Sequence, residues 1–457
     1  MKKDLNMNFS SLALEPEMLY TLETLGYKQT TPIQEKTLPL ILEGKDVIAE
    51  AKTGSGKTAA FGIGLLSRLD VKKFRVQSLI LCPTRELADQ VAKELRRIAR
   101  FKHNIKILTL TGGESFGKQL GSLEHQAHVI VGTPGRILKH LNKESLELSN
   151  LETLVLDEAD RMLDMGFIEE IENLLAFTPK ERQTLLFSAT YDDEIMKISN
   201  KIQSNAVSVK TTHQEVANKI RQEFYETNNK QETFIKILSQ YKPENVIVFT
   251  NTKIEAKQLA ENLQSKKIDA IAIHGDLEQY ERNDVLVQFA NKSCPILVAT
   301  DVAARGLDIK ELSMVVNFDI PHGQETYIHR IGRTGRAGAE GIAITLYGTY
   351  ERENAESYRD ANCKFLLEVD LKGSINFEMK PQYVTLVIEG GKKDKIRAGD
   401  LLGALTGDAG LAGSSIGKID IYDRQSYVAI ERNLIEEAQK QLSFGKIKGK
   451  NFSVWIL

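Results

Sequence analysis

The chain contains 457 residues, of which 42% are hydrophobic and 27% are charged, and its formal net charge at pH 7 is −2. This length is sufficient for roughly two to four domains, and the near-neutral balance excludes a chain that binds nucleic acid through its overall charge. Three scattered cysteines exclude a disulfide scaffold. Because the sequence has neither a signal-peptide-like start nor a run of about 18 apolar residues, we expect a cytoplasmic protein without a membrane anchor.

Short apolar segments alternate with helical segments over most of the chain, in two series separated by a less regular stretch. The predicted strands are residues 46–50, 78–82, 106–110, 128–132, 152–156 and 184–188 in the first series, and 245–250, 269–273, 295–299, 314–319 and 341–346 in the second. Such alternation predicts parallel sheets with helices on both faces. We therefore expect two α/β domains, residues 1–205 and 219–365, joined by a linker at 206–218.

The segment that follows the first predicted strand is typical of a phosphate-binding loop. Residues 51–58 read Ala-Lys-Thr-Gly-Ser-Gly-Lys-Thr, with Ala51 where the usual pattern has its first glycine. The glycines let backbone N–H groups turn toward phosphate oxygens, and the helix that begins here adds a partial positive charge. In such loops the lysine contacts the β- and γ-phosphates and the hydroxyl contacts Mg²⁺. The predicted nucleotide-binding residues of the loop are Thr53, Gly54, Ser55, Gly56, Lys57 and Thr58.

A pair of acids directly follows the predicted strand at 152–156. P-loop enzymes place a metal-binding aspartate at such a strand end, so Asp157 is predicted to hold Mg²⁺, with Thr58, through water. Glu158 is then placed to polarise the water that attacks ATP. A solvated acidic turn is the alternative, but the upstream loop and the preceding strand favour a site that binds ATP and Mg²⁺. Lys57, Asp157 and Glu158 are its predicted catalytic residues.

A third domain is predicted at residues 381–457, after a second linker at 366–380. Its elements are a strand at 383–389, a helix at 398–405, strands at 416–422 and 426–430, a helix at 434–442 and a strand at 452–457. The order β-α-β-β-α-β is that of the ferredoxin-like fold of RNA-recognition modules. The predicted fold class is therefore α/β for two domains, followed by a smaller α+β domain.

The motifs of the first two domains resemble those of the DEAD-box RNA helicases over about residues 9–350, and they occur in the order of that family. They are Phe9 with Gly26–Gln34, Ala51–Thr58, Pro83–Ala88, Gly112-Gly113, Thr133–Arg136, Asp157–Asp160, Ser188–Thr190, Val248–Asn251, Gln279 with Arg282, Ala299–Asp308 and His329–Arg336. One departure is Thr30, where many members carry proline, and we expect little effect from it. The resemblance implies two RecA-like domains and RNA-dependent ATP hydrolysis.

The resemblance also implies roles for residues outside the loop and the acids. Gln34 would read the adenine edge, because an amide offers both a donor and an acceptor, and Tyr27 would stack on the base unless it is simply a core aromatic. Asp308 would contact the ribose, and Arg333 and Arg336 would reach the γ-phosphate as arginine fingers. Residues expected to couple the phosphate site to the second domain are Asp160, Ser188, Thr190 and His329.

RNA contacts implied by the resemblance fall on loops at strand ends and suit phosphates and 2′-hydroxyls better than bases. The helicase core should therefore separate short duplexes locally, with little sequence preference, as ATP and RNA close the two domains together. We expect RNA and not DNA as the substrate. The predicted RNA-binding residues of the core are Arg85, Gly113, Thr133, Arg136, Thr250 and Thr300.

Specificity must then come from the third domain, which has 11 Lys and Arg against 9 Asp and Glu. A charge cluster is usually a solvated surface, but on a module of this fold we expect RNA binding. Tyr427 is the one aromatic of its strand, so we infer that a basic edge grips a folded hairpin and that single strands do not bind across the sheet. Trp455 is expected in the core. The two basic clusters are Lys392, Lys393, Lys395 and Arg397, and Lys446, Lys448 and Lys450.

A helicase core that ends in such a module resembles the bacterial DEAD-box protein A (DbpA-like) subfamily. That resemblance implies a hairpin of 23S ribosomal RNA as the target and a role in assembly of the large ribosomal subunit. Two alternatives stay open: a general RNA-remodelling helicase in mRNA decay or cold stress, and an ATP-gated RNA clamp. Glu158, Arg333 and Arg336 argue against the clamp. The sequence carries no oligomer signal, so a monomer is expected by default.

Overall fold

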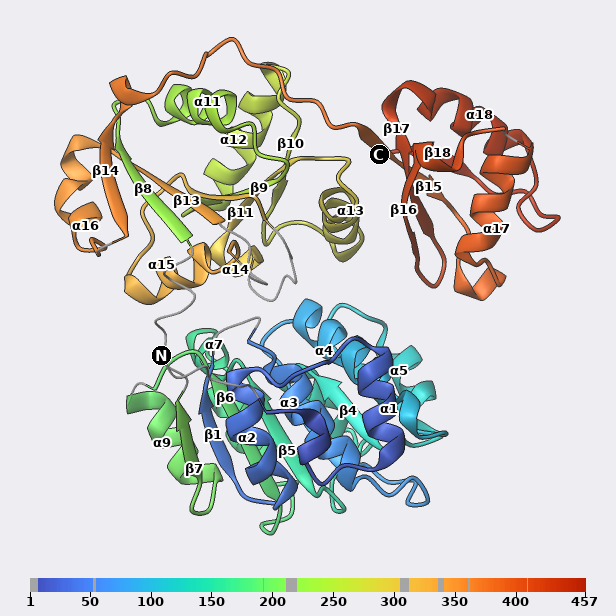
Figure 1. The fold of residues 1–457 in the computed structure, drawn as a ribbon. Helices are drawn as coiled ribbons and strands as arrows, with labels where there is room; N and C mark the ends of the chain where they lie inside the picture. Colours follow the sequence, from blue (N-terminus) through green and yellow to red (C-terminus); the bar gives the residue numbers. More distant parts are fainter. Residues whose placement is uncertain are drawn as a thin grey trace. The chain divides into compact units, whose positions relative to one another are not determined.

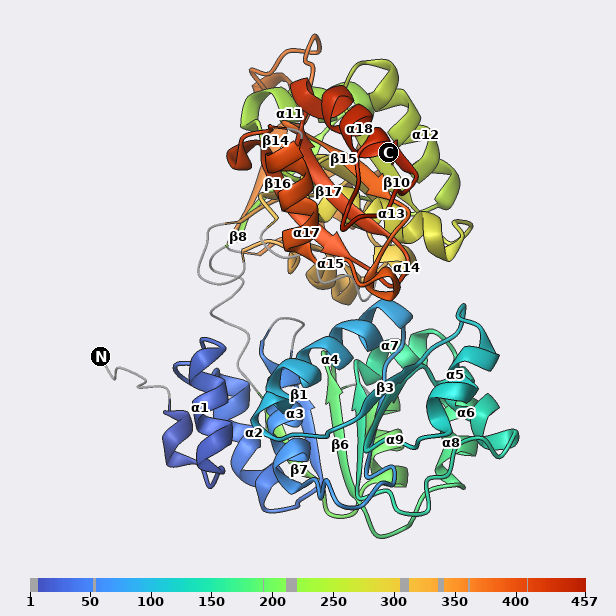
Figure 2. The ribbon, with the colours of Figure 1, turned by 90° about the vertical axis from the view of Figure 1, so that its right-hand side faces the viewer.

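The computed structural model describes residues 7–51, 55–191, 193–210, 220–304, 312–335, 341–360, 362–408 and 410–457, without the side chains of Glu325 and Asp408. The chain divides into two compact units with a boundary near residue 213. The first unit holds one α/β domain, and the second unit holds another α/β domain and a smaller C-terminal domain (Figure 1, Figure 2).

The first domain is built on a seven-stranded parallel sheet with the order β3-β4-β2-β5-β6-β1-β7. Its strands are β1 (Val47–Glu50), β2 (Ser78–Leu81), β3 (Ile107–Leu110), β4 (Val129–Gly132), β5 (Thr153–Asp157), β6 (Gln183–Ser188) and β7 (Val207–Lys210). Successive residues point to opposite faces, so that Val47 and Ala49 lie in one core and Ile48 in the other. Burial on both faces explains why the sequence shows continuous apolar runs here.

Helices cover both faces of this sheet, as the alternation predicted. Three of them begin with proline at the first helical position, which suits a residue without an N–H. One face packs against α1 (Pro16–Thr24), α2 (Pro32–Leu42), α3 (Lys57–Arg68) and α4 (Arg85–Ile98). The other packs against α5 (Phe116–Leu123), α6 (Pro134–Asn142), α7 (Ala159–Asp164), α8 (Ile168–Leu175) and α9 (Asp193–Ile202).

Strand β7 lies in the segment that the sequence assigned to the linker at 206–218, and that boundary was therefore wrong. β7 pairs in parallel with β1 and forms the edge of the sheet. Its short sequence, Val-Ser-Val-Lys, has only two apolar residues, which gives too weak a signal for a strand. The edge position explains the polar residues, since one side of an edge strand faces solvent. Residues 211–219 lie outside the described residues.

The second α/β domain also has seven parallel strands, in the order β10-β11-β9-β12-β13-β8-β14. The strands are β8 (Ile220–Glu226), β9 (Val246–Thr250), β10 (Ala270–Ile273), β11 (Ile296–Thr300), β12 (Met314–Asn317), β13 (Gly341–Tyr347) and β14 (Cys363–Leu367). The helices are α11 (Lys230–Tyr241), α12 (Lys253–Ser265), α13 (Gln279–Ala290), α14 (Asp301–Ala304), α15 (Gln324–Ile331) and α16 (Arg352–Glu356).

Strands β8 and β14 were missed in the sequence because their polar residues hide the strand pattern. Gln222 and Glu223 of β8 are each only 1% exposed, yet both find hydrogen-bond partners. The Tyr327 hydroxyl donates to Gln222 Oε1 at 2.7 Å, and the Tyr241 hydroxyl donates to Glu223 Oε2 at 2.6 Å. Buried polar groups with partners are compatible with a central strand, although their residue types suggest a surface.

The predicted linker at 366–380 is bound along the second domain and is not a free connection. Leu371 is buried in the core of that domain, and the Lys372 N–H donates to Gln240 Oε1 at 2.8 Å. Further on, Met379 forms an isolated parallel bridge with Ile268. The sequence suggested a linker here because the segment has no continuous apolar run, whereas its anchoring depends on contacts distant in sequence.

The C-terminal domain has the predicted β-α-β-β-α-β order. Its antiparallel sheet has the order β16-β17-β15-β18, and both helices lie on one face of it (Figure 1). The elements are β15 (Tyr383–Ile388), α17 (Ala398–Gly403), which continues as a π-helical turn at Ala404–Asp408, β16 (Ile416–Ile421), β17 (Ser426–Glu431), α18 (Ile435–Phe444) and β18 (Val454–Ile456). Across the parts of the chain that the structure describes, none of the helices is both long and apolar enough to cross a membrane.

We predict that Gly132→Ala destabilises the first domain. A Cβ at Gly132, the last residue of β4, would lie 2.3 Å from the Leu110 carbonyl oxygen and 2.8 Å from Ile137 Cδ1. We expect a loss of about 1–3 kcal/mol, because backbone cannot move aside as a flexible side chain can. Gly121→Ala is the matched control, since Gly121 lies within α5 with open space around its Cβ. It should stabilise by up to about 1 kcal/mol. Urea unfolding of the full chain measures both, and equal effects would contradict this packing.

Candidate nucleotide and RNA sites

Both sets of predicted functional residues of the first domain lie at the carboxyl ends of its strands, where open α/β sheets bind ligands. The phosphate loop follows β1, and the acids end β5, two strands away. Residues predicted to bind RNA follow β2, β3 and β4 on the other half of the same edge. The sheet order therefore separates the predicted nucleotide-binding residues from the predicted RNA-binding residues, and we call these two parts of the edge the nucleotide half and the RNA half.

Hydrogen bonds of Gln34 join the phosphate loop to the segment that we predict to read adenine. The Gln34 amide nitrogen donates to the Gly56 carbonyl at 3.0 Å, and its amide oxygen accepts from the Thr31 N–H at 2.9 Å. Gly56 caps helix α3 with φ of +95°, in the left-handed region that favours glycine. Ala51, where the pattern usually has glycine, is fully buried, and its N–H donates to the Ser188 carbonyl at 2.8 Å. Thr53 and Gly54 lie outside the described residues.

Two acids and two cations form a buried charge cluster beside this loop. Lys57 Nζ lies 3.3 Å from Asp157 Oδ1 and 3.9 Å from Glu158 Oε1, while Arg161 forms an ion pair with Glu158. All four side chains are almost completely buried. Burial alone would lower the pKa of Lys57, but Asp157 and Glu158 outweigh it and raise that pKa, so the ammonium stays charged. Burial raises the pKa of Asp157, an effect that Lys57 opposes.

Asp157 has the free oxygens that a magnesium site requires. Apart from its ion pair with Lys57, neither buried carboxylate oxygen has a hydrogen-bond partner among the described residues. The half-buried hydroxyl of Thr58, in the first turn of α3, provides a second oxygen. One carboxylate and one hydroxyl suit Mg²⁺, which keeps several waters and binds the phosphates of its substrate. The described residues contain no cluster of three or more His, Cys, Asp or Glu side chains that could hold a metal by themselves.

Three of the four residues predicted to couple the phosphate site to the second domain, Asp160, Ser188 and Thr190, lie together near the end of β6. Asp160 Oδ2 accepts from the Ala189 N–H at 3.3 Å, and the Thr190 N–H donates to Ser188 Oγ at 3.3 Å. Glu158 caps α7 in the left-handed conformation, with φ of +56°, which is strained for a residue with a side chain. The strand end at β5 is thus tied to the strand end at β6 through Asp160.

Tyr27, predicted to stack on adenine, is a partly buried ring at the margin of the first core. Its hydroxyl donates to Glu94, and its ring meets Phe9 edge-on with centroids 6.1 Å apart. Burial, and then the hydrogen bond to Glu94, raise the pKa of Tyr27, so the hydroxyl stays protonated. Stacking on a base stays a prediction for this residue.

On the RNA half of the edge, glycine and arginine are packed together. A Cβ at Gly113 would lie 1.6 Å from Arg85 Nη1, so a larger residue would displace that guanidinium, and the φ of +77° at this position also favours glycine. Thr133 follows β4 and caps α6. Arg136 Nη1 donates to Gln119 Oε1 at 2.6 Å and to the Glu114 carbonyl at 3.1 Å, which orients it. The structure therefore brings Arg85, Gly113, Thr133 and Arg136 to one edge.

In the second domain, a buried arginine that sequence reasoning missed organises the strand ends. Arg330 is 1% exposed and binds Asp301 with two bonds, Nε to Oδ1 and Nη2 to Oδ2, each 2.7 Å long. It also donates to Asn251 Oδ1 at 3.0 Å and to the Asp319 carbonyl at 2.7 Å. Asn251 follows Thr250 at the end of β9, and Asp301 follows Thr300 at the end of β11. The sequence signal that could have identified Arg330 as a functional residue is its position directly after His329, within the His329–Arg336 motif.

The remaining predicted residues of the second domain lie partly outside the described residues. His329 is in the last turn of α15 and is half-buried, and Arg333 follows that helix and is 4% exposed. Asp308 and Arg336 belong to segments that the structure does not describe. Their roles stay predictions.

In the C-terminal domain, the fold brings the two predicted basic clusters together. Lys448 Nζ donates to the Lys395 carbonyl at 2.9 Å, which joins the loop after β15 to the loop before β18. Phe444, at the end of α18, is 81% exposed and adds an aromatic ring beside Lys446 that the sequence analysis did not single out. We call this the basic surface; its exposed members are Lys392, Lys393, Lys395, Arg397, Phe444, Lys446, Lys448 and Lys450.

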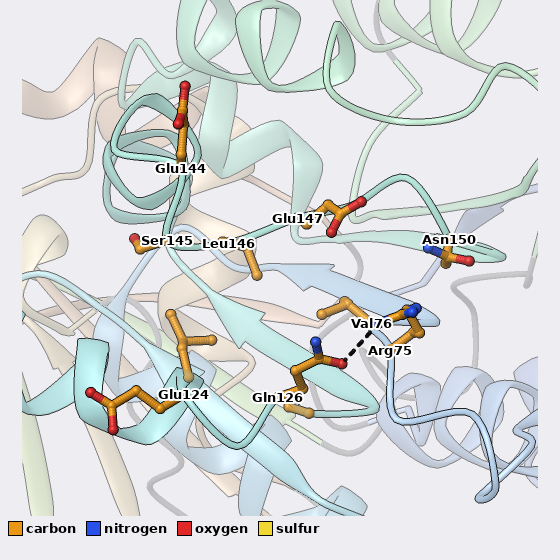
Figure 3. Close-up of a pocket in the computed structure, with 11 residues that line it drawn as sticks. Arg75, Val76, Glu124, Gln126, Glu144, Ser145, Leu146, Glu147 and Asn150 are labelled. Atoms are coloured by element: carbon orange, nitrogen blue, oxygen red, sulfur yellow. Dashed lines mark hydrogen bonds between the residues drawn. The ribbon is translucent and has the colours of Figure 1, made fainter.

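A shallow pocket of the first domain lies at the amino ends of its strands, opposite the carboxyl ends that hold the predicted sites (Figure 3). Its lining includes Val76, Ala127 and Asn150, which precede β2, β4 and β5. Figure 3 also shows the hydrogen bond from Arg75 Nη1 to Gln126 Oε1, 3.4 Å long. No residue that we predict to bind nucleotide or RNA lines it.

These features define a two-domain P-loop nucleoside triphosphatase with an added RNA-recognition fold. Family models agree along the chain: residues 31–198 match the DEAD/DEAH box helicase, 229–338 the helicase conserved C-terminal domain, and 385–456 the DbpA RNA binding domain. The chain belongs to the DEAD-box family of ATP-dependent RNA helicases and is of the DbpA type.

Individual relatives support this assignment. The chain is 49% identical over 453 residues to the ATP-dependent RNA helicase DbpA of Escherichia coli (strain K12), covering 98% of this chain and 99% of that protein. It is 49% identical over 342 residues to the DEAD-box ATP-dependent RNA helicase CshA of Geobacillus kaustophilus (strain HTA426), covering 74% and 73%. The structure of S. cerevisiae Dbp5 bound to RNA and ADP BeF3 is similar with a TM-score of 0.72, at 33% identity over 79% of this chain and 96% of that one.

We predict that Glu158→Gln abolishes most ATP hydrolysis while ATP binding persists. Glutamine keeps the size of the side chain but cannot accept a proton, and a general base contributes about 10²–10⁴ in rate. RNA-stimulated release of phosphate should fall at least about 100-fold. Fluorescent nucleotide titration is the control for an intact loop. Hydrolysis at the normal rate would show that Glu158 does not act as the general base.

Proposed function

We propose that this RNA helicase acts on a hairpin of 23S ribosomal RNA during assembly of the large ribosomal subunit, and that the C-terminal domain selects the target. The observation that carries the proposal is the basic surface, because separate clusters joined into one exposed area suit a folded RNA. The exposed ring of Phe444 gives this surface a place where an unpaired base can stack. The resemblance to the DbpA-like subfamily supplies the identity of the RNA.

ATP is the energy source in this proposal, and the first domain holds it. Lys57 binds the β- and γ-phosphates, Gln34 reads the adenine, and Thr58 with Asp157 holds Mg²⁺, which neutralises phosphate charge when bound. Glu158 orients and deprotonates the attacking water. Arg161, ion-paired with Glu158, positions that carboxylate, and Lys57 opposes the rise in the pKa of Asp157 that burial causes.

Hydrolysis depends on the second domain in this proposal. Arg333 and Arg336 stabilise the charge that develops on the γ-phosphate, and Asp308 contacts the ribose. Domain closure by ATP and RNA thereby becomes a condition for turnover. The route between the sites runs through Asp160, Ser188, Thr190 and His329.

RNA is gripped through its backbone by both helicase domains in this proposal. Arg85, Gly113, Thr133 and Arg136 contact it from the first domain, and Thr250 and Thr300 from the second. Such contacts carry no base preference, so specificity rests on the C-terminal domain. Local strand separation follows from bending one strand as the domains close, and phosphate release reopens them. We take a cytoplasmic monomer as the working form.

We predict that a 23S fragment carrying a hairpin from the peptidyl-transferase region stimulates steady-state ATP hydrolysis far more than poly(A) or the same fragment without the hairpin. Salt must be fixed, because phosphate contacts make affinity depend steeply on ionic strength. Charge reversal of the basic surface, Lys392→Glu with Lys446→Glu, should remove the preference. Lys440→Glu is the matched control, since Lys440 is an exposed lysine of α18 outside both clusters. Equal stimulation by all RNAs would contradict targeting to the hairpin and would favour a general RNA-remodelling helicase.

A further inference from the structure

Arg136, which we propose to contact RNA, is bound through only one of its nitrogens. Both hydrogens of Nη1 are used, on Gln119 Oε1 at 2.6 Å and on the Glu114 carbonyl at 3.1 Å. Among the described residues, neither Nε nor Nη2 of Arg136 has an acceptor. These two nitrogens form the edge with which Arg330 binds the Asp301 carboxylate, and the same edge suits a phosphate.

The amide of Gln119 has only one possible orientation. Its side chain, in α5, is 3% exposed, and Nε2 donates to the Thr111 carbonyl at 3.0 Å and to Glu114 Oε2 at 3.4 Å. A carbonyl can only accept and a guanidinium can only donate, so a rotated amide would oppose like groups on both sides. Gln119 therefore offers its oxygen to Arg136 at one fixed place.

A buried histidine contacts the same amide oxygen. His140 of α6 is fully buried, and its Nε2 lies 3.1 Å from Gln119 Oε1. Burial, and then the charges of Arg136 and Lys139, lower the pKa of His140 to about 4, so the ring is neutral near pH 7. Because the amide oxygen only accepts, the ring hydrogen is on Nε2, and Nδ1 accepts from the Ser145 hydroxyl, 2.8 Å away. Hydrogen bonds thus connect Ser145, His140 and Gln119 to Arg136.

An aromatic ring packs against both His140 and Arg136. Phe116, in the first turn of α5, stacks on the His140 ring with centroids 4.2 Å apart and planes at 15°. The guanidinium carbon of Arg136 lies 6.0 Å from the Phe116 centroid, a distance at which a ring attracts a cation. Phe116 thereby fixes the plane of His140 and adds an attraction for Arg136 that the hydrogen bonds do not supply.

Arg136 needs this support because a second arginine stands near it. Burial, and then the positive charge of Arg85, lower the pKa of Arg136. Two cations repel each other, so an Arg136 side chain without its partners would turn away from Arg85 and from the RNA half of the edge. An RNA phosphate near both guanidiniums would remove the repulsion. The support therefore keeps a repulsive pair of charges in place until the ligand arrives.

We propose that Gln119 and His140 are positioning residues for RNA binding, which hold the Arg136 guanidinium with its Nε and Nη2 available to an RNA phosphate. Gln119 and the Glu114 carbonyl are neutral acceptors, so Arg136 keeps its full charge for the ligand. A carboxylate at position 119 would instead form an ion pair and compete with the phosphate. The inference rests on the proposed RNA contact of Arg136, but not on the identity of the RNA.

The positioning is tested by a double-mutant cycle in the full chain. Affinity for a fluorescent oligo(A) is measured at fixed salt, with a non-hydrolysable ATP analogue, for Gln119→Met, Arg136→Ala and both together. Arg136→Ala should weaken binding about tenfold or more, because a charged hydrogen bond to phosphate is lost. Gln119→Met should weaken it about fivefold in the original chain, but less than about twofold further once Arg136 is alanine. A merely structural role would give the same loss in both backgrounds.

Gln77→Met is the matched control, because Gln77 is another buried glutamine of this domain. It is 2% exposed and precedes β2, at the amino ends of the strands. Its Nε2 donates to the carbonyls of Asp70 and Lys73 at 2.8 Å each, and its Oε1 accepts from the Asp70 N–H at 2.9 Å. Urea unfolding should show a loss of stability similar to that of Gln119→Met, whereas affinity for oligo(A) should stay within about twofold.

Steady-state ATP hydrolysis separates RNA binding from turnover. Gln119→Met should raise the poly(A) concentration for half-maximal stimulation about fivefold, with the rate at saturating poly(A) within about twofold. His140→Phe keeps a ring to stack on Phe116 and removes the hydrogen bond to Gln119. It should show a weaker form of the same pattern, and it keeps the inference testable if Gln119→Met fails to fold.

Three outcomes would overturn the inference. An equal loss of affinity from Gln119→Met in both backgrounds would make its effect structural. Normal affinity in Gln119→Met, while Arg136→Ala binds weakly, would show that Arg136 needs no positioning by Gln119. Unchanged affinity in Arg136→Ala would contradict the proposed RNA contact on which the inference rests. Hairpin preference does not enter, because oligo(A) has no hairpin, so failure of the proposed ribosomal target is distinguished from failure of the positioning.

Discussion

The fold of the first domain depends on a buried cluster of two carboxylates and two cations at the carboxyl end of its sheet, where the acids at the end of β5 meet Lys57 of α3 and Arg161 of α7. Each charge is tolerated only because another balances it, and removing one partner from such a group costs about 3–5 kcal/mol. The spacing of β1, β6 and β5 in the sheet sets the distance between Lys57 and Asp157. Glu158, the residue after Asp157, adopts a left-handed backbone conformation. The residues that balance each other's buried charge are therefore also those expected to act in hydrolysis. The strained backbone at Glu158 lies at the expected reaction site.

The same logic of paired buried groups extends through the second unit. Arg330, like Lys57, binds groups at strand ends. Its partners include the neutral side chain of Asn251 and the Asp319 carbonyl as well as the carboxylate of Asp301. The pattern recurs between the C-terminal domain and α13, where the Tyr427 hydroxyl donates to Asp284 Oδ1. The proposed functional residues are thus positioned by strand ends, which the sheets make rigid, and oriented by side chains that have few alternative partners.

Much of this arrangement could be predicted from the sequence, because the buried parallel strands are continuous apolar runs and the motifs follow their ends. What escaped prediction shares a physical cause: its stabilisation comes from contacts distant in sequence. The short edge strand β7 and the polar strand β8 lack an apolar run, and the segment at 366–380 is fixed by pairing with Ile268. Arg330 was missed because its burial depends on partners distant in sequence, Asn251, Asp301 and Asp319. Trp455 was expected in the core of its domain, but it packs against Val287, Val387 and Tyr427 on the other face of the sheet, which a three-residue strand does not reveal.

The most direct measurement of the central claim, that the buried Asp157 holds Mg²⁺, is the magnesium dependence of nucleotide binding. Fluorescent ATP analogue affinity is measured for the full chain and for Asp157→Asn, each with Mg²⁺ and with EDTA. The account predicts that Mg²⁺ tightens binding about tenfold or more in the original chain, about 1.4 kcal/mol, and that Asp157→Asn keeps the EDTA affinity but loses this gain. An equal gain in both proteins would contradict it.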